Sequence, residues 1–341
     1  MTLDQLGKVF GFEPPRAQGH NVVNAVQAMV DGRAKVFIGL GGNFVRAIPD
    51  WTVAEAAMRR LRLTVAVSTK LNRGHLVHGE EALILPALAR SDIDMQAGGR
   101  QSVTVEDSMS MVHAPSGLVT SPSEHLNSEV AIVCGMAKAT LPDRGIDWDF
   151  HVADYDRIRD KIEAVFPDLF ADFNKRIRVP GGFHLTTPPR ERVWNTATGR
   201  ANFLVFPGVR EDEAVSDPSA LRLATLRSHD QYNTTIYTLD DRYRGVFGGR
   251  MVVFMNEADM RDRGIAEGDL VEIESLADDK HRVVGAFWAK THSIAAGSVG
   301  AYYPETNPLL PLAYHDVKSG TPAAKSIPVL VRLQPQLNAG Q

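Results

Sequence analysis

The chain has 341 residues, which is enough for about two domains with hydrophobic cores of their own. Hydrophobic residues make up 44% of it and charged residues 23%, as in ordinary soluble globular proteins, and the net charge of −4 gives no general attraction to nucleic acid. No apolar run approaches the roughly 20 residues that span a bilayer, and the N-terminus shows no secretory signal. We therefore expect a cytoplasmic protein without membrane insertion and without a nucleic-acid partner.

The single cysteine, Cys134, limits the chemistry that this chain can encode alone. It excludes an internal disulfide, and it excludes an iron–sulfur cluster or a cysteine zinc site, which need several thiolates. Cys134 lies in the apolar run VAIVCGMA, so we predict a buried hydrophobic side chain rather than a nucleophile.

The first half of the chain alternates between helix patterns and short apolar runs. The hydrophobic spacing predicts a helix over residues 21–31, a strand over 35–40 and a second strand over 63–68. A further helix is predicted after Pro49-Asp50, with the Asp50 side chain capping its first N–H groups. This order of elements indicates a parallel α/β sheet.

Ligands of such sheets bind beyond the carboxyl ends of the strands, where two polar loops follow. These loops are Gly41-Gly42-Asn43 and residues 68–72. The first is not a dinucleotide fingerprint, and a tight turn that uses the freedom of glycine explains it equally well.

Residues 92–122 are polar and irregular, which is long for a connection without structure and suggests a functional or partner-covering loop. Helices are predicted at 129–138 and 154–166. The composition then shifts to Pro, Gly, Thr and Arg, so we divide the chain into an α/β domain at 1–178 and a β-barrel domain at 179–341.

The second half reads as short strands joined by glycine turns, which is typical of a closed barrel. The predicted strands cover residues 221–226, 251–256, 270–275, 282–289, 300–304 and 327–333. In 270–275, Val271 and Ile273 alternate with Glu272 and Glu274, as in a strand with one buried face.

A run of small polar side chains, residues 227–235, follows the first of these strands, and such loops commonly recognise small molecules. Arg242, Arg244 and Arg250 come next, and guanidinium groups suit phosphate or carboxylate oxygens. The alternative is a solvated loop whose arginines pair with Asp240 and Asp241.

Several motifs then occur in a recognisable order. Gly264–Ile273 has the form G-ϕ-x-x-G-D-x-V-x-ϕ, where ϕ is apolar. RSHDQYNTTIY and DDRYRG precede it, AYYPETNPLLPL and KSGTPAAKSIPV follow it, and Gly41-Gly42-Asn43, Pro49-Asp50 and STKLNRGHLVHGEEALILPAL stand upstream. Over nearly the whole chain this series resembles the C-terminal half of the molybdenum oxidoreductases, closest to their formate-dehydrogenase-like branch.

The resemblance implies an α/β domain followed by a double-psi β-barrel that binds molybdopterin guanine dinucleotide, two copies of which hold molybdenum in the complete enzyme. In the barrel domain it implies contacts to a pterin and its diphosphate by Arg227, Ser228, Gln231, Tyr232, Asn233, Thr234, Arg242, Asn256, Tyr303, Glu305, Asn307 and Lys325. In the α/β domain it implies contacts to a guanosine diphosphate end by Gly42, Asn43, Ser68, Lys70 and Asn72. These residue types suit the task, since N–H and hydroxyl groups bind phosphate and amides pair with pterin or guanine edges.

Four side chains in these loops have structural alternatives. His229 and Asp230 can bond the polar loop to itself. His75 and His78 are expected to be solvent or fold histidines, because no third metal ligand stands at suitable spacing.

The sequence departs from the family in two respects. The N-terminal half, which in the family holds a molybdenum ligand, a catalytic histidine and a lysine beside the pterin, is not in this chain. We therefore expect no catalytic residue here, an inactive isolated chain, and a partner that is the missing half in the same or a separate chain. Formate dehydrogenases also carry an arginine and a glutamine where this chain has Ser108 and Ser110, so the small-molecule substrate is not expected to be formate.

Two other functions remain open from the sequence. The chain could be a non-catalytic module that binds a nucleotide or a protein surface. It could also be a nucleotide-dependent enzyme that uses the α/β domain alone, although no P-loop or dinucleotide fingerprint is present.

Overall fold

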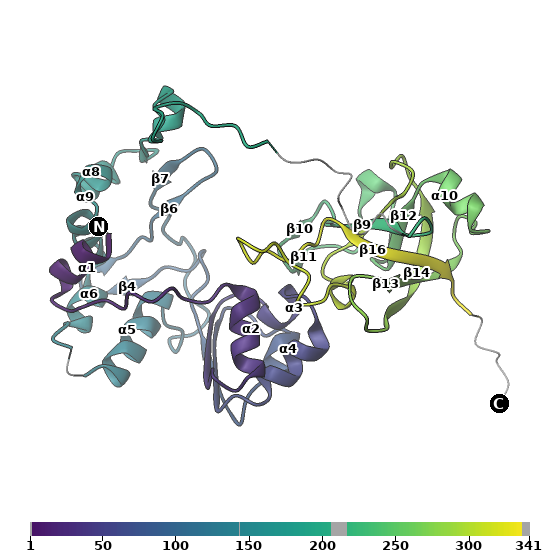
Figure 1. The fold of residues 1–341 in the computed structure, drawn as a ribbon. Coiled ribbons are helices and arrows are strands. Elements are labelled where there is room, and N and C mark those ends of the chain that lie inside the picture. The colour runs from purple at the N-terminus through teal and green to yellow at the C-terminus, as the bar shows by residue number, and fades with distance from the viewer. Residues whose placement is uncertain (1, 143, 206–216, 336–341) are drawn as a thin grey trace. The chain divides into compact units, whose positions relative to one another are not determined.

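The computed structural model of this protein describes residues 2–142, 144–205 and 217–335 (Figure 1). The chain divides into two compact units that interleave along the sequence. The first comprises Met1–Gln18, Val67–Lys70 and Ile84–Phe206, and the second comprises Gly19–Ala66, Leu71–Leu83 and Pro207–Gln341. The domain boundary between 178 and 179 stays a prediction.

The α/β part of the second unit follows the predicted order of elements. They are α2 (Val22–Val30), β1 (Val36–Leu40), α3 (Phe44–Ala47), α4 (Trp51–Met58), β2 (Leu63–Ser68), η1 (Arg73–Leu76) and β3 (Glu81–Pro86). The sheet order is β1-β2-β3. Helix α2 begins where Asn21 caps it, the side-chain oxygen accepting from the Asn24 N–H at 2.9 Å.

One face of this sheet carries the apolar residues that the helices cover. Met29 of α2 and Ala57 and Met58 of α4 are buried together with Leu61, and Phe37 of β1 packs against them. The apolar spacing seen in the sequence therefore marks the side of each helix that faces the sheet.

The predicted capping role of Asp50 is wrong. Asp50 stands before α4 with a φ of 55°, and its side chain makes no capping hydrogen bond. Its carboxylate instead accepts two hydrogen bonds from Arg282 of the barrel, each at 2.9 Å, and both side chains are nearly buried. A bidentate ion pair to a distant strand thus replaced the local cap, which no local pattern reveals.

The barrel of the second unit is closed, with strand order β12-β14-β13-β16-β9-β15. Its strands are β9 (Leu221–Leu226), β12 (Val252–Met255), β13 (Leu270–Ser275), β14 (Arg282–Thr291), β15 (Ser298–Tyr302) and β16 (Ile327–Leu333). The β12–β14 and β9–β15 pairs are parallel, and the other pairs are antiparallel. Short pieces accompany them: the hairpin β10 (Gln231–Tyr232) and β11 (Thr235–Ile236), η5 (Arg242–Arg244), α10 (Glu257–Asp262) and η6 (Asn307–Leu309).

Alternate side chains of these strands fill the barrel. Leu221 and Leu223 of β9 and Val271 and Ile273 of β13 are at most 1% exposed, as their alternation predicts. Burying one such side chain contributes about 1.5–3 kcal/mol. The turn before β13 is set by Gly264 and Gly268, both at positive φ.

The first unit contains mostly short elements. They are α1 (Thr2–Phe10), β4 (Met95–Gln96), β5 (Gly99–Arg100), β6 (Val105–Glu106), β7 (Met111–His113), α5 (Glu129–Thr140), α6 (Trp148–Ala153), α7 (Asp156–Val165), α8 (Pro167–Phe170), α9 (Phe173–Arg176), β8 (Phe183–His184) and η2 (Pro188–Glu191). The segment 92–122 is more ordered than predicted, because β4 pairs with β5 and β6 pairs with β7. Ser108 and Ser110 lie in the turn between β6 and β7, where Ser110 has a φ of 61°.

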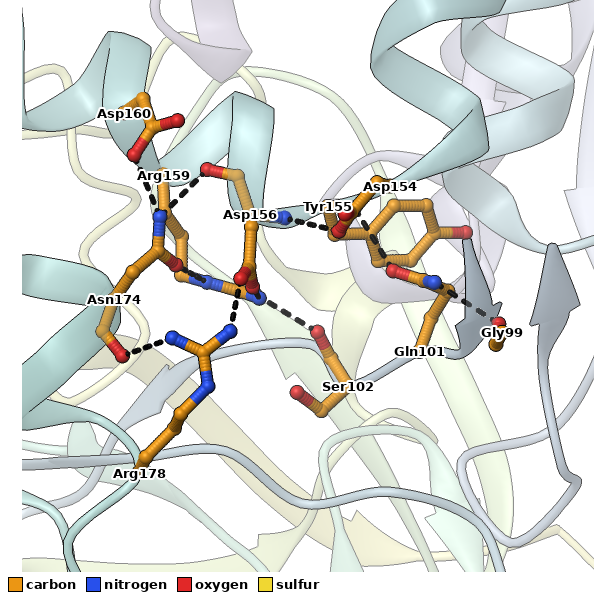
Figure 2. Close-up of polar contacts among 10 residues, drawn as sticks. All are labelled: Gly99, Gln101, Ser102, Asp154, Tyr155, Asp156, Arg159, Asp160, Asn174 and Arg178. Carbon is orange, nitrogen blue, oxygen red and sulfur yellow. Dashed lines mark hydrogen bonds and ion pairs between the residues drawn. The ribbon is translucent and has the colours of Figure 1, made fainter. Parts of the chain in front are cut away.

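A buried polar network around Arg159 joins three segments of the first unit (Figure 2). The Arg159 guanidinium donates to Asn174 Oδ1 at 2.7 Å, to the Ser102 carbonyl at 3.1 Å and to Asp156. Asp156 also pairs with Arg178. Burial raises the pKa of the Asp156 carboxyl, but the hydrogen bonds from Arg159 and Arg178 outweigh it, so the pKa is lowered.

Cys134 is buried in α5, and burial raises the pKa of its thiol, in agreement with a structural role. In the part of the chain that the structure describes, no helix is both long and apolar enough to cross a membrane.

Candidate functional site

The candidate site lies where strands β9 and β15 end. These strands are parallel neighbours, with Leu226 opposite Tyr302, so the chain leaves the barrel at the same end after both. The polar loop after β9 and the segment 303–307 after β15, both of which the family resemblance had selected as cofactor contacts, are therefore brought together. The loop folds back as the hairpin β10–β11, with Asn233 at positive φ in its turn.

Arg250, at the entry to β12, is the buried centre of this site. It is 6% exposed, and its guanidinium lies 4.7 Å from the Tyr302 ring. It donates to Glu305 at 2.6 and 3.1 Å, to Ser228 Oγ at 2.6 Å, to Gln231 Oε1 at 2.9 Å and to the Tyr303 carbonyl at 2.8 Å. One guanidinium thus fixes the two loops against each other.

Three of the predicted contact residues use their polar atoms for hydrogen bonds within this network. Ser228 is buried against Arg250, and both oxygens of Glu305 are bonded to Arg250. Gln231 accepts from Arg250 and from the Ser228 N–H, and it donates to the carbonyls of Asn233 and Tyr303 at 2.7 and 2.8 Å. In this structure these three residues hold the loops in shape, and direct contact with a cofactor stays a prediction for them.

Other predicted residues are exposed beside the hydrogen-bond network of Arg250. Arg227, Tyr232 and Asn233 are exposed, and the Arg227 guanidinium lies 5.4 Å from the Tyr303 ring. Arg227 also donates to Asn233 Oδ1 at 3.5 Å. Burial raises the pKa of the Tyr303 phenol, and Arg227 partly opposes that shift. These side chains form a cationic and aromatic surface next to the buried network.

The carboxylate of Asp241, which directly precedes η5, is also buried. It is 1% exposed, and one of its oxygens accepts from the Tyr302 hydroxyl at 2.9 Å and from Arg244 at 2.5 Å. Its other oxygen, Oδ1, has no hydrogen-bond partner among the described residues. Burial raises the pKa of Asp241, but the bonds from Arg244 and Tyr302 prevail and lower it.

The pairing of arginines with Asp240 and Asp241, considered from the sequence, holds for Arg244 with Asp241. Arg250 pairs instead with Glu305, which follows a different strand. Sequence reasoning noticed Arg250 but did not choose it as a site residue, because its partners lie about 20 to 55 residues away in the chain.

The segment 46–48 at the end of α3 reaches the same end of the barrel within the second unit. The Tyr303 hydroxyl donates to the Ala47 carbonyl at 3.2 Å, and Asn307, which is 2% exposed, donates to the carbonyls of Arg46 and Ile48 at 2.8 and 3.0 Å. Asn307 is therefore a buried clamp in this structure. These bonds place α3, which begins directly after Asn43, beside the segment after β15.

The Gly41-Gly42-Asn43 loop combines positive φ with an unsatisfied polar atom. Gly41 and Gly42 have φ of 69° and 72°, and the Gly42 carbonyl accepts from Asn72 Nδ2 at 3.0 Å. Asn43 Oδ1 is buried and has no hydrogen-bond partner in the described ranges. A buried acceptor without a partner costs about 1–3 kcal/mol, so it is a natural place for a ligand N–H.

The histidines near this loop have structural partners. His75 Nδ1 accepts from the Asn72 N–H at 2.9 Å and completes the cap of η1, while His78 Nδ1 lies 2.7 Å from the Gly79 carbonyl.

In the loop after β9, the His229 ring packs 4.0 Å from that of Tyr243, and the Asp230 carbonyl accepts from the Tyr237 N–H. Within the described residues, no three His, Cys, Asp or Glu side chains gather as a metal site.

The remaining predicted residues are spread more widely. Lys325 donates to the Thr225 carbonyl near the end of β9, and burial together with the charge of Arg227 lowers its pKa. Thr234 is half-buried in the hairpin turn, and Arg242 is exposed 5.5 Å from the Tyr243 ring. Asn256 follows the far end of β12 from Arg250, where it caps α10 and donates to the Ile294 carbonyl at 2.8 Å.

Ser68 and Lys70 belong to the first unit. The Ser68 hydroxyl donates to the Lys70 carbonyl at 2.6 Å, and the Lys70 side chain is exposed. Contact of Lys70, Ser68 or Asn256 with a cofactor stays a prediction.

The second unit thus contains residue types that suit an anionic ligand with nitrogenous rings. Arg227 and Lys325 supply positive charge near the end of β9, Tyr232 supplies an exposed aromatic face, and Asn43 supplies an unpaired acceptor.

Comparison with known proteins identifies the barrel. The family described as "Molydopterin dinucleotide binding domain" matches residues 221–328, which run from β9 into β16. The chain carries a dinucleotide-binding barrel of the kind found in molybdopterin oxidoreductases. The closed six-stranded barrel is accordingly of the double-psi type, and the predicted fold class and the resemblance to the C-terminal part of these oxidoreductases are confirmed.

The relatives are longer than this chain. A protein named "Uncharacterized oxidoreductase" from Mycobacterium tuberculosis is 51% identical over 340 residues, which cover 98% of this chain and 43% of the relative. Protein YdeP of Escherichia coli strain K12 is 47% identical over 330 residues, covering 96% of this chain and 43% of YdeP. The chain therefore spans less than half of the curated relatives that it matches.

Among solved structures, acetylene hydratase from Pelobacter acetylenicus is similar, with a TM-score of 0.57 and 13% identity. The match covers 98% of this chain and 50% of the hydratase, and at this identity it shows a shared fold alone.

Proposed function

We propose that this chain is the cofactor-binding part of a formate-dehydrogenase-like molybdenum oxidoreductase, and that its barrel-end site holds molybdopterin in the guanine dinucleotide form. The arrangement around Arg250 is the main support. That arginine consumes the polar atoms of Ser228, Gln231 and Glu305, and thereby fixes a surface on which Arg227 and Asn233 stay exposed. A preorganised surface binds its ligand without a further cost for ordering loops.

The roles of the chain's own groups follow from their chemistry. The Arg227 guanidinium offers paired N–H donors to the oxygens of a diphosphate. Tyr232 is 71% exposed and offers a face for stacking a ring, and the unpaired Asn43 Oδ1 can accept from a base N–H. When bound, the group supplies two-electron redox chemistry at molybdenum, while the protein positions it.

We further propose that the isolated chain turns over no substrate and carries no iron–sulfur cluster. It spans 43% of its relatives, and its one cysteine is buried in a helix. The missing part, supplied in the same or a separate chain, would complete the active site.

The small substrate is proposed to differ from formate. Ser108 is exposed and Ser110 half-buried in the turn between β6 and β7, and neither offers the positive charge that would bind a carboxylate.

Titration of the chain with purified molybdopterin guanine dinucleotide, followed by calorimetry, tests the binding. Arg227→Ala should weaken binding by about tenfold or more, because a hydrogen bond to a charged group contributes about 1.5–3 kcal/mol. The matched control is Arg261→Ala, an exposed arginine on α10, which should leave affinity unchanged.

Two results would contradict the proposal. Guanosine diphosphate bound as tightly as the whole dinucleotide would indicate a simple nucleotide-binding module. Turnover of a dye-linked substrate by the loaded chain without any partner would contradict only the proposed inactivity of the isolated chain.

A further inference from the structure

One face of strand β1 is apolar and exposed. Val36, Ile38 and Leu40 are 50%, 56% and 53% exposed, although they alternate with Phe37, which packs against the helices on the other side. Successive side chains of a strand point to opposite faces, so these three lie together on the uncovered one. Single exposed apolar residues are common on protein surfaces, but a row of them on one strand marks an interaction surface.

The sheet is also open beside β1. In the sheet order of the described residues β1 has β2 as its only neighbour, so its second edge is open. Sheets of α/β proteins are normally covered by helices on both faces, and here α2 and α4 cover one.

The comparisons indicate what covers the other face. In relatives about half identical to this chain, the polypeptide outside the matched region is longer than the matched region itself. That polypeptide belongs to the same molecule as the equivalent of this sheet, so it is the nearest source of an apolar partner surface.

We propose that Val36, Ile38 and Leu40, here called the β1 face, form the docking surface for the part of the family polypeptide that this chain lacks, and that the partner docks through the apolar side of an amphipathic helix. The β1 face is apolar throughout, so shape and burial rather than charge select the partner. This docking does not depend on the cofactor, and either proposal can fail without the other.

Co-expression tests the docking. This chain is produced in the same cell as a tagged polypeptide made of the remainder of the Mycobacterium tuberculosis relative, so that the two fold together. We expect both chains to co-purify at a one-to-one ratio, and we expect amide hydrogen exchange at residues 36–40 to slow in the complex relative to the free chain.

Variants place the contact on the β1 face. Ile38→Asn should weaken the complex by at least tenfold, because it puts an unpartnered amide into an apolar interface. Leu333→Asn is the matched control, since Leu333 is a similarly exposed strand residue, at 48%, in β16 of the barrel. Because both side chains are already exposed, both variants of the free chain should keep the melting temperature of the wild type.

Three outcomes would overturn the proposal. One is the absence of any complex after co-expression. Another is a complex that Ile38→Asn and Leu333→Asn affect equally. The third is dimerisation of the free chain with protection of residues 36–40, which would make a second copy the occupant.

Discussion

Arg250 in the barrel and Arg159 in the first unit are both 6% exposed, and both bridge segments that are distant in sequence. Arg159 links α7 to the Ser102 carbonyl and to Asn174, and its partners form a closed set with Arg178 (Figure 2). Arg250 links two loops at the end of the barrel in a similar way.

The two networks differ in what surrounds them. Beside Arg250 stand the exposed Arg227 and Asn233, and nearby Asp241 has an oxygen without a partner in the described chain. No atom of the Arg159 network is among the buried atoms left unpaired in the described residues. A buried arginine therefore does not mark a binding site by itself, and the exposed or unsatisfied groups around Arg250 are what make it the candidate.

The largest effect is expected from Arg250→Met. The change leaves Glu305 without its cation and Ser228 and Gln231 without their donor, so the free energy of unfolding should fall by about 3–5 kcal/mol. Affinity for the dinucleotide should fall further than in Arg227→Ala, because both loops lose their common support. Urea denaturation and calorimetric titration measure the two losses.

The exposed Arg261 again supplies the control, and Arg261→Met should change stability by no more than about 0.5 kcal/mol. The double variant Arg250→Met/Glu305→Gln should regain part of the stability, since it removes the unpaired charge. If Arg250→Met unfolds no more easily than the control, the network does not support the site.

Arg159→Met should lower the free energy of unfolding nearly as much, but it should leave the affinity for the dinucleotide unchanged. It leaves Asp156 with one of its two arginines and Asn174 without its donor, so we expect a loss of about 3 kcal/mol. Hydrogen exchange should quicken around Ser102 and Asn174, while dinucleotide affinity measured by calorimetry stays at the wild-type value.

The milder Arg178→Met provides a comparison, because that side chain is 62% exposed and its ion pair should contribute at most about 1 kcal/mol. A loss of dinucleotide affinity in Arg159→Met would contradict the contrast between the two networks.

The smallest effect concerns pH. Arg244 and Tyr302 lower the pKa of Asp241 in the folded protein, so its contribution to stability is present above the unfolded pKa of about 4 and is lost as the pH falls through the lower folded value. Asp241→Asn removes this titration. Thermal unfolding followed from pH 6 to about pH 3 should show a smaller fall of melting temperature in the variant than in the wild type.

Other carboxylates with lowered pKa, such as Asp156, titrate in both proteins and cancel in the difference. Parallel curves for Asp241→Asn and wild type would show that Asp241 has no depressed pKa in the folded state.

Much of the fold was predictable because its signals are local. The strands β9, β13 and β16 were predicted with their observed bounds, since alternating apolar residues report directly which face is buried. The turn before β13 was predictable for a similar reason, because Gly264 and Gly268 supply positive φ. The hairpins between residues 92 and 122 were missed, as their strands are two or three residues long.

The candidate site was only partly predictable. Polarity selected the loop after β9, and the family resemblance selected the segment after β15 and predicted ligand contacts for Gln231, Glu305 and Asn307, whereas in the structure their polar atoms bond within the protein. Whether a polar side chain forms its hydrogen bonds within the protein depends on partners that the fold brings from distant parts of the chain.

The sequence by itself determined the longer strands and helices and the glycine turn before β13, because those choices depend on neighbours a few residues apart. Only the tertiary structure decided that Arg250 lies between Gln231 and Glu305, that Asp50 pairs with Arg282, and that Asn43 keeps an unpaired oxygen. The physical reason is that hydrogen bonds and ion pairs act over about 3 Å in space. Residues that form them across 55 or 232 positions of chain leave no periodic trace.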